Sequence, residues 1–201
     1  MGTRRIGAED SKSRAMLLDA AHAIMLEDGY AAVTSRKVAA RAGLKPQLVH
    51  YYFRTMDDLF LALLRRGAER NLERQARALA SPQPLWALWR LNSDSTGTAL
   101  HVEFTALATH RKTIAADIAA YAETFRRQQL DAVGEALAGY GVEAAALSPV
   151  VVVTLMNAVA QVLTMEDGLG VHLGHAELRA LVEHHLTRLE GPRADADAAA
   201  S

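Results

Sequence analysis

Residues 34–53 read TSRKVAARAGLKPQLVHYYF, and this stretch decides the fold. Thr34 is a good N-cap for a short helix over residues 35–42, and Gly43 ends that helix in a tight turn. Pro46 then opens a second short helix at its first position, where the missing N–H costs nothing. Two short helices joined by such a turn form the helix-turn-helix pattern, whose second helix can enter the major groove of DNA.

The faces of these two helices separate core residues from candidate DNA contacts. Val38, Ala39 and Ala42 face inward from the first helix, and Val49 and Phe53 face inward from the second. A glutamine can read adenine, a leucine can touch a thymine methyl group, and tyrosine, histidine and basic side chains can reach phosphates. The candidate DNA-binding residues are Thr34, Ser35, Arg36, Lys45, Pro46, Gln47, Leu48, His50, Tyr51 and Arg54. Spacing alone leaves the alternative of packed helices that bind nothing, because short helix pairs are common.

The rest of the sequence also favours helix, since no strand-like alternation persists over more than a few residues. Further predicted helices span residues 14–28, 56–81, 84–92, 96–110, 113–139, 149–166 and 175–189. We therefore expect an all-α protein of about nine helices. Its predicted parts are a DNA-binding domain over residues 11–66, a second helical domain over residues 67–190 and a disordered tail over residues 191–201.

Two stretches carry a resemblance to a known family: GYAAVTSRKVAARAGL (residues 29–44) and VHYYFRTMDDL (residues 49–59). They are similar to the N-terminal domain of TetR-family transcriptional regulators, and the likeness covers roughly residues 13–66. The resemblance implies a helix-turn-helix DNA-binding domain followed by a helical domain that binds a small-molecule effector and forms a homodimer.

The sequence departs from the family pattern at three places. Lys45 stands where the family usually has a serine, so the second helix lacks a side-chain oxygen cap, which Pro46 offsets in part. Met56 replaces a phosphate-facing lysine, for which Arg54 is a candidate substitute. His50 and the tyrosine at position 52 stand where tyrosine and histidine are common. We therefore expect the chain to bind DNA, but the operator sequences of other family members do not predict the one that this chain recognises.

Charge is distributed unevenly along the chain, with a basic N-terminal part and an acidic remainder. The chain has 201 residues and a formal net charge of −1, but residues 1–70 hold twelve basic against eight acidic side chains. Such an asymmetry suggests that the basic N-terminal part binds a polyanion. The chain has no cysteine, which excludes disulfides, thiolate metal sites and thiol nucleophiles and fits a reducing cytoplasm. We expect a cytoplasmic protein.

The second domain offers candidates for an effector pocket. Apolar pockets with a few polar groups suit small molecules, and aromatic side chains with nearby histidines supply both. The alternative is ordinary core, because aromatic residues at helical spacing usually just pack. The candidate ligand-binding residues are Trp86, Trp89, His101, Phe104 and His110, with Glu103 beside them.

The helix over residues 149–166 is apolar nearly all round, and residues 144–165 carry no charge. A membrane span is not expected, because Asn157 and Gln161 interrupt the apolar run and basic flanking residues are missing. A surface helix shows one apolar stripe, so this helix must bury a second face. We expect it to form a homodimer together with the helix over 175–189; burial within one chain is the alternative.

Four histidines near the C-terminus, His172, His175, His184 and His185, suit zinc or copper by residue type. Such histidines are more often solvated surface residues, so we predict no metal and no cofactor. No paired acidic site, phosphate loop or Ser-His-Asp order is present in the sequence, and we predict no enzyme activity.

The predicted function is a repressor that binds a near-palindromic DNA operator and is released by an unknown small molecule. The alternative is a helical protein that binds DNA non-specifically or a small molecule, without a defined operator.

Overall fold

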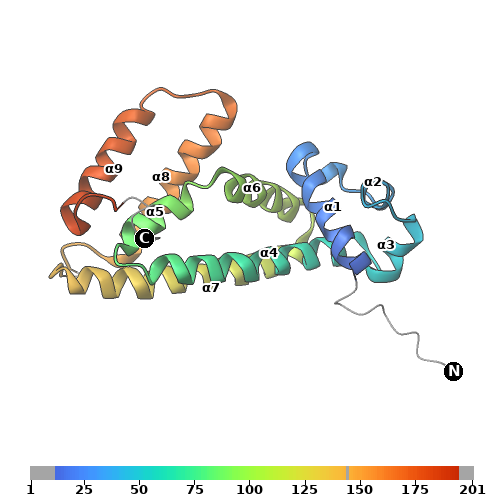
Figure 1. The fold of residues 1–201 in the computed structure, drawn as a ribbon, viewed down its shortest axis with the longest axis horizontal. Coiled ribbons are helices and arrows are strands. Elements are labelled where there is room, and N and C mark those ends of the chain that lie inside the picture. Colours follow the sequence, from blue (N-terminus) through green and yellow to red (C-terminus); the bar gives the residue numbers. More distant parts are fainter. Residues whose placement is uncertain (1–11, 144, 195–201) are drawn as a thin grey trace. The chain divides into compact units, whose positions relative to one another are not determined.

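The computed structural model describes residues 12–143 and 145–194. Ser11, at the start of the predicted first domain, and residues 195–201 of the predicted tail lie outside the described residues. The described part contains nine α-helices, one short 3₁₀-helix and no strand (Figure 1). The elements are α1 (Lys12–Asp28), η1 (Tyr30–Ala32), α2 (Ser35–Arg41), α3 (Pro46–Tyr52), α4 (Met56–Leu79), α5 (Pro84–Asn92), α6 (Ser95–His110), α7 (Lys112–Gly139), α8 (Pro149–Leu169) and α9 (His175–Glu190).

The all-α prediction is confirmed, and the nine predicted helices are present with ends that shift by three residues at most. The short helix η1 was not predicted. It follows Gly29, whose φ of 81° lies in the left-handed region that favours glycine. A single 3₁₀ turn has no apolar periodicity, so hydrophobic patterning cannot reveal it.

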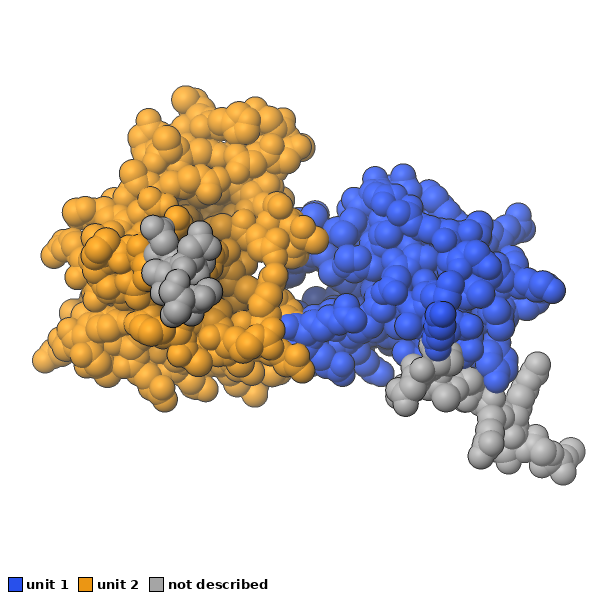
Figure 2. All heavy atoms as spheres, viewed as in Figure 1, with its two compact units in different colours: residues 1–70, 99–121 blue, residues 71–98, 122–201 orange. Residues whose placement is uncertain are grey.

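The chain divides into two compact units, coloured separately in Figure 2. Unit 1 comprises residues 1–70 and 99–121, and unit 2 comprises residues 71–98 and 122–201. The division is not sequential, because most of α6 and the start of α7 group with the N-terminal helices. The domain boundary predicted between residues 66 and 67 falls inside α4.

Unit 1 has one apolar core, to which every helix of the unit contributes. Leu17, Ile24 and Met25 of α1 are fully buried against Phe60 of α4 and Leu107 of α6. The inward-facing residues predicted for the helix-turn-helix also lie in this core: Val38, Ala39, Val49 and Phe53 are buried and Ala42 packs against them. The core fixes how α2 and α3 are presented to solvent.

The starts of α2 and α3 follow the predicted capping chemistry, and α4 also begins with a side-chain cap. The Lys37 backbone N–H donates to Oγ1 of Thr34 at 3.3 Å, which caps α2. Helix α3 begins at Pro46 with no side-chain cap from Lys45. At the start of α4, the Asp58 N–H donates to Oγ1 of Thr55 while the Thr55 N–H donates to the Asp58 carboxylate. This reciprocal pair is a capping box.

Unit 2 has its own apolar core, formed by α5, α7, α8 and α9. Its members are Leu85, Trp86, Leu88, Trp89, Val133, Leu137, Val153, Met156, Ala160, Leu163 and Leu186. Helices α8 and α9 run side by side, joined by a short loop (Figure 1). Their packing places the C-terminal end of α8 next to the N-terminal end of α9.

The end of α9 is tied to the beginning of α5. The carboxylate of Glu190 accepts the backbone N–H groups of Leu85 and Trp86 at 2.8 and 2.9 Å, which caps α5. The indole N–H of Trp86 donates to the Gly191 carbonyl oxygen at 3.1 Å. The side chain of Gln83 binds the backbone of residues 190, 192 and 194. Residues 191–194, assigned to the tail by sequence, are therefore held in place by hydrogen bonds.

Helix α8 keeps a large apolar surface in contact with solvent. Leu155 is 58% exposed, and Val150, Val151, Val162 and Met165 are 44–48% exposed. By length and composition, α8 is the one helix in the described part that could cross a membrane, and 22% of its most apolar window is buried. Its other face packs in the core of unit 2, so α8 has one face in the core and one that a single chain leaves uncovered.

Candidate nucleic-acid interface

Helix α3 presents one of its faces to solvent. Gln47, His50 and Tyr51 are exposed, with Tyr51 at 44%, while Val49 points into the core at 1%. Leu48 is half-buried, so only part of this side chain remains available for contact. Seven residues make two helical turns, and the alternation of burial along them gives α3 one anchored face and one outward polar face.

The basic side chains around α3 fall into two groups. Lys37 forms an ion pair with Asp28 at 2.8 Å, and Arg41 forms a two-pronged pair with Glu27 at 2.5 and 2.6 Å. These two pairs connect α2 to α1 and neutralise charge close to the interface. The exposed cations at positions 36, 45 and 54 form no salt bridge within the described part of the chain. They are the cations that remain for phosphate contacts.

Aromatic packing fixes the C-terminal half of α3. The rings of Tyr51 and Tyr52 meet edge to face, with centroids 5.0 Å apart. Phe53 is buried, and the guanidinium carbon of Arg14 lies 5.3 Å from the centre of its ring. Rigid support beneath an exposed surface favours specific recognition, because little conformational freedom is lost on binding.

Polar contacts join residues 99–121 to the helix-turn-helix within unit 1. The backbone N–H of Tyr30 donates to the Glu103 carboxylate at 2.6 Å, and the rings of Tyr30 and His110 stack with centroids 6.3 Å apart. Asp57, in the first turn of α4, binds both Arg111 and Thr113. Helix α6 and the start of α7 are thus bound to η1, which precedes α2, and to the first turn of α4, which follows α3.

The residues predicted to line one effector pocket lie in different units. Trp86 and Trp89 are each 6% exposed in the core of unit 2. Phe104 is buried in the core of unit 1, and His101 and His110 are exposed on the same helix. Desolvation lowers the pKa of His101 below its ordinary value. Glu103 accepts the hydrogen bond from Tyr30. Neither unit by itself brings the five predicted residues together.

Sequence patterning missed a chain of amide side chains inside unit 2. Asn92 donates to Asn157, Asn157 donates to Gln129 at 2.9 Å, and Gln129 donates to Gln75 at 2.8 Å. Gln75 and Gln129 are fully buried. The four residues come from α5, α8, α7 and α4, so their partnership depends on tertiary structure. The sequence signal that could have indicated this chain is a glutamine or asparagine at a position where the helical periodicity predicts a buried residue.

A shallow hollow of about 310 Å³ lies nearby in unit 2, lined by Arg74, Ala78, Ala87, Arg90, Leu91 and Asp94. Arg74 and Asp94 form an ion pair at 2.7 Å across it. Burial by itself raises the pKa of Asp94, but the hydrogen bond and charge of Arg74, together with hydrogen bonds from the backbone N–H groups of Thr96 and Gly97, outweigh this effect and hold that pKa below its ordinary value.

Comparisons with known proteins agree with this geometry. Residues 17–63 match the family model described as bacterial regulatory proteins, tetR family. Over 129 residues the chain is 30% identical to the HTH-type transcriptional regulator BetI of Rhizobium meliloti (strain 1021), which is 63% of this chain and 58% of that regulator's length. The match therefore spans less than two thirds of the relative.

Solved structures extend the likeness in fold to nearly the whole chain. A TetR-family regulator from Rhodococcus sp., itself described as putative, superposes with a TM-score of 0.71 at 18% identity, covering 90% of this chain and all of that one. GusR of Salmonella enterica gives a TM-score of 0.70 at 17% identity, covering 92% and 98%. The family model therefore assigns residues 17–63 to the DNA-binding region of the TetR family of bacterial regulatory proteins, and the solved structures show that the chain shares the fold of these proteins.

Proposed function

We propose that this protein is a sequence-specific DNA-binding transcriptional regulator that reads its operator with α3. The observation that carries the proposal is the outward face of α3: exposed Gln47, His50 and Tyr51 on a rigidly anchored helix, flanked by cations without acidic partners in the described residues. Helix-turn-helix proteins place the N-terminal residues of the second helix against base edges in the major groove. These exposed residues occupy that position.

The exposed residues divide by chemistry into base readers and phosphate contacts. Gln47 can form two hydrogen bonds with adenine, and the accessible part of Leu48 can touch a thymine methyl group. His50, Tyr51 and the cations at 36, 45 and 54 suit phosphates, as do the hydroxyl groups of Thr34 and Ser35 at the start of α2. Pro46 presents no N–H and contributes by fixing the start of α3.

A homodimer is the arrangement that suits both the operator and the surface of unit 2. The uncovered apolar face of α8, with 55% exposed Leu181 on α9, supplies a surface that a second copy can bury. Two recognition helices related by two-fold symmetry read a near-palindrome whose half-sites lie about 34 Å apart, one turn of DNA. A cytoplasmic location follows from this role, since the chain must reach the chromosome.

We further propose that the regulator is a repressor released by a small-molecule effector bound in unit 2. The buried Trp86 and Trp89, the amide chain and the neighbouring hollow supply aromatic surface and polar groups in one unit. An effector releases DNA only if it binds the conformation with low DNA affinity more tightly. Helix α6 contains residues of both units and holds Glu103, which binds the loop before α2. A shift of α6 would therefore displace the segment before α2 and change the position of the recognition helix α3.

The decisive experiment is selection of genomic DNA fragments by the purified full-length protein at about 0.15 M salt, followed by sequencing. We expect one enriched near-palindrome, bound by two chains, with an affinity about 10³–10⁷ times that for random DNA. Equal affinity for enriched and random fragments would instead support the alternative of non-specific binding.

Three variants assign the roles of residues on that operator. Tyr51→Ala should weaken binding to every sequence, whereas Gln47→Ala should relax base preference at one position of each half-site. Arg54→Ala should reduce the slope of log affinity against log salt by about 1 per contacted phosphate. Arg127→Ala is the control, because this exposed arginine of unit 2 pairs with Glu123 within its own helix. Identical operator binding by wild type, Q47A and Y51A would overturn the assignment of α3.

A further inference from the structure

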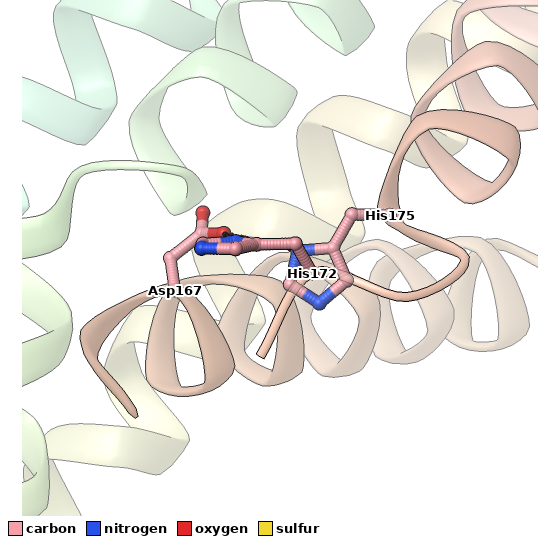
Figure 3. A group of neighbouring side chains, drawn as sticks. All are labelled: Asp167, His172 and His175. Atoms are coloured by element: carbon pink, nitrogen blue, oxygen red, sulfur yellow. Dashed lines mark hydrogen bonds and ion pairs between the residues drawn. The ribbon is translucent and has the colours of Figure 1, made fainter. Parts of the chain in front are cut away.

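Three potential metal ligands converge where α8 passes into α9. Figure 3 shows Asp167 near the end of α8 facing His172 of the connecting loop and His175, the first residue of α9. Nδ1 of His172 lies 3.1 Å, and Nδ1 of His175 lies 3.0 Å, from the same carboxylate oxygen of Asp167. One ligand atom from each residue lies within 4.8 Å of the others. The cluster has no part in the DNA-binding function proposed above.

The backbone of the connecting loop holds this arrangement. Helix α8 ends with Gly170 at a φ of 76°, and the Val171 N–H turns back to donate to the Glu166 carbonyl oxygen at 2.9 Å. The His175 N–H donates to the His172 carbonyl oxygen at 3.2 Å, and Gly174 between them has a φ of 82°. Two positive-φ glycines and two backbone hydrogen bonds thus bring the two imidazoles over the end of α8.

We propose that Asp167, His172 and His175 form a binding site for a divalent transition-metal ion of the zinc type. Zinc bonds to nitrogen and oxygen are about 2.0–2.2 Å long, and at tetrahedral angles such bonds place neighbouring ligand atoms about 3.3–3.5 Å apart. The two histidine–aspartate distances of 3.0 and 3.1 Å need only a small expansion to reach this spacing. Imidazole and carboxylate ligands without thiolate suit Zn²⁺, Co²⁺ and Ni²⁺.

Two further side chains complete the surroundings of the ion. Oε2 of Glu166 lies 2.7 Å from Nε2 of His175, where it orients the imidazole as carboxylates do for metal-bound histidines. Arg179 donates to the second oxygen of Asp167 at 2.8 Å and leaves the first oxygen facing the imidazoles. With neutral imidazoles, two carboxylates and one guanidinium give a net charge of −1, which favours a divalent cation.

Exposure within the cluster suits a site that takes an ion from solution. The side chain of His172 is 66% exposed and that of Asp167 is 41% exposed, whereas His175 is 9% exposed at the base. The ion would link the C-terminal end of α8 to the N-terminal end of α9, the two helices that carry the uncovered apolar surface. The other reading of these contacts is a metal-free network in which His175 forms ion pairs with Glu166 and Asp167.

The test is titration of the full chain, without an affinity tag and after chelator treatment, with Zn²⁺ by calorimetry and with Co²⁺ by visible absorption. We expect one ion per chain and a Co²⁺ spectrum of a four- or five-coordinate nitrogen and oxygen site. His172→Ala should lower the Zn²⁺ affinity at least about tenfold, since loss of a direct ligand costs no less than loss of a supporting residue. His172 is the primary variant because it is exposed and its removal leaves the core intact.

The matched control is the double variant His184→Ala with His185→Ala. These two histidines are exposed on α9, and their rings lie 5.5 Å apart, so they represent adventitious histidine binding on the same helix. We expect this variant to retain one Zn²⁺ per chain with unchanged affinity. The proposal is overturned if the wild type binds no ion, if His172→Ala binds as tightly as wild type, or if the double variant abolishes binding. Circular dichroism of each variant verifies its folding.

Discussion

The two compact units bury their helices with different chemistry. The core of unit 1 is apolar, and the polar ties among its helices, such as Arg66 with Asp19 and Arg41 with Glu27, lie at the surface. The buried polar side chains found in the described residues are Gln75, Gln129 and His175, and all three belong to unit 2. A close-packed apolar core has no polar group that could be left unpaired, whereas a buried amide needs a hydrogen-bond partner in every conformation that it adopts.

This difference matches the tasks proposed for the two units. A DNA-reading surface needs a rigid mounting, and a close-packed apolar core supplies it at no risk of unpaired polar groups. A unit that binds an effector and changes conformation benefits from polar groups that can exchange one partner for another. The amide chain of unit 2 provides such groups in its interior.

The largest effect should come from breaking the buried amide chain. Gln129→Ala removes the group that binds both Gln75 and Asn157, so the oxygen of buried Gln75 and the amide N–H of half-buried Asn157 lose this partner. We expect a loss of about 2–6 kcal/mol in the free energy of unfolding, at about 1–3 kcal/mol for each orphaned group. Urea unfolding at fixed protein concentration measures the loss, and hydrogen exchange should place it in residues 122–139 of α7.

The double variant Gln75→Leu with Gln129→Leu serves as the control for this effect. Replacement of both partners of the Gln75–Gln129 bond removes that polar pair from the core, so the double variant should recover the part of the loss that comes from the orphaned Gln75 oxygen. Asn157 still loses its acceptor, and Gln128 and the Phe125 carbonyl oxygen lose the Gln75 amide donor, so the recovery should be partial. If Gln129→Ala lowers the free energy of unfolding by less than about 0.5 kcal/mol, the amide chain does not stabilise unit 2. The polar groups in the core of unit 2 would then not distinguish its stability from that of unit 1.

A smaller effect is expected from the tie between α6 and the loop before α2 in unit 1. Glu103→Ala removes the acceptor for the Tyr30 N–H, and a charge-assisted bond of this kind contributes about 1.5–3 kcal/mol. We expect a loss of about 1–2 kcal/mol, since water can reach the half-buried site, and most of it should return in Glu103→Gln, which keeps an acceptor. Thermal and urea unfolding of both variants measure the difference.

Glu123→Ala provides the comparison in unit 2. Glu123 pairs with Arg127 on the surface of α7, where both side chains are about 70% exposed, and such pairs contribute less than about 0.5 kcal/mol. Equal destabilisation by Glu103→Ala and Glu123→Ala would mean that Glu103 acts as an ordinary surface carboxylate and does not secure the helix-turn-helix.

The same contrast explains what the sequence could predict. Thr34, Gly43 and Pro46 act through local backbone chemistry, so the ends of α2 and α3 were predictable from a few residues. The outward set on α3 followed from helical periodicity and the buried Val49. The exposed or half-buried state of these residues agrees with the predicted interface, while their contacts with DNA stay a prediction.

The features that escaped prediction all depend on distant partners. Glu103 meets Tyr30 across 73 positions of sequence, and Gln129 meets Gln75 across 54. Periodicity marks the buried face of a helix but does not say which other helix packs against it. The residues predicted for one effector pocket therefore came from two different units. Asp167 was overlooked beside His172 and His175 because the turn that joins them was not foreseen.

The smallest effect concerns His22, a half-buried titratable group on α1 in unit 1. Burial, followed by the charge of Arg66, holds the pKa of His22 below its ordinary value of 6.5, although Asp19 acts in the opposite direction. The unfolded chain therefore takes up this proton first as the pH falls. Its contribution to stability is complete above pH 6.5 and is lost as the pH falls through the lower pKa of the folded state.

Urea unfolding of the wild type and of His22→Gln, compared between pH 7.5 and 5, isolates this contribution, because the other seven histidines cancel in the difference. We expect the wild type to lose no more than about 0.5 kcal/mol relative to the variant, since solvent reaches the imidazole and salt screens Arg66. A relative gain of stability at low pH would mean that Asp19 outweighs burial. In that case the electrostatics at this position of α1 would be set by a surface carboxylate more than by burial, and His22 would not report on the apolar packing of unit 1.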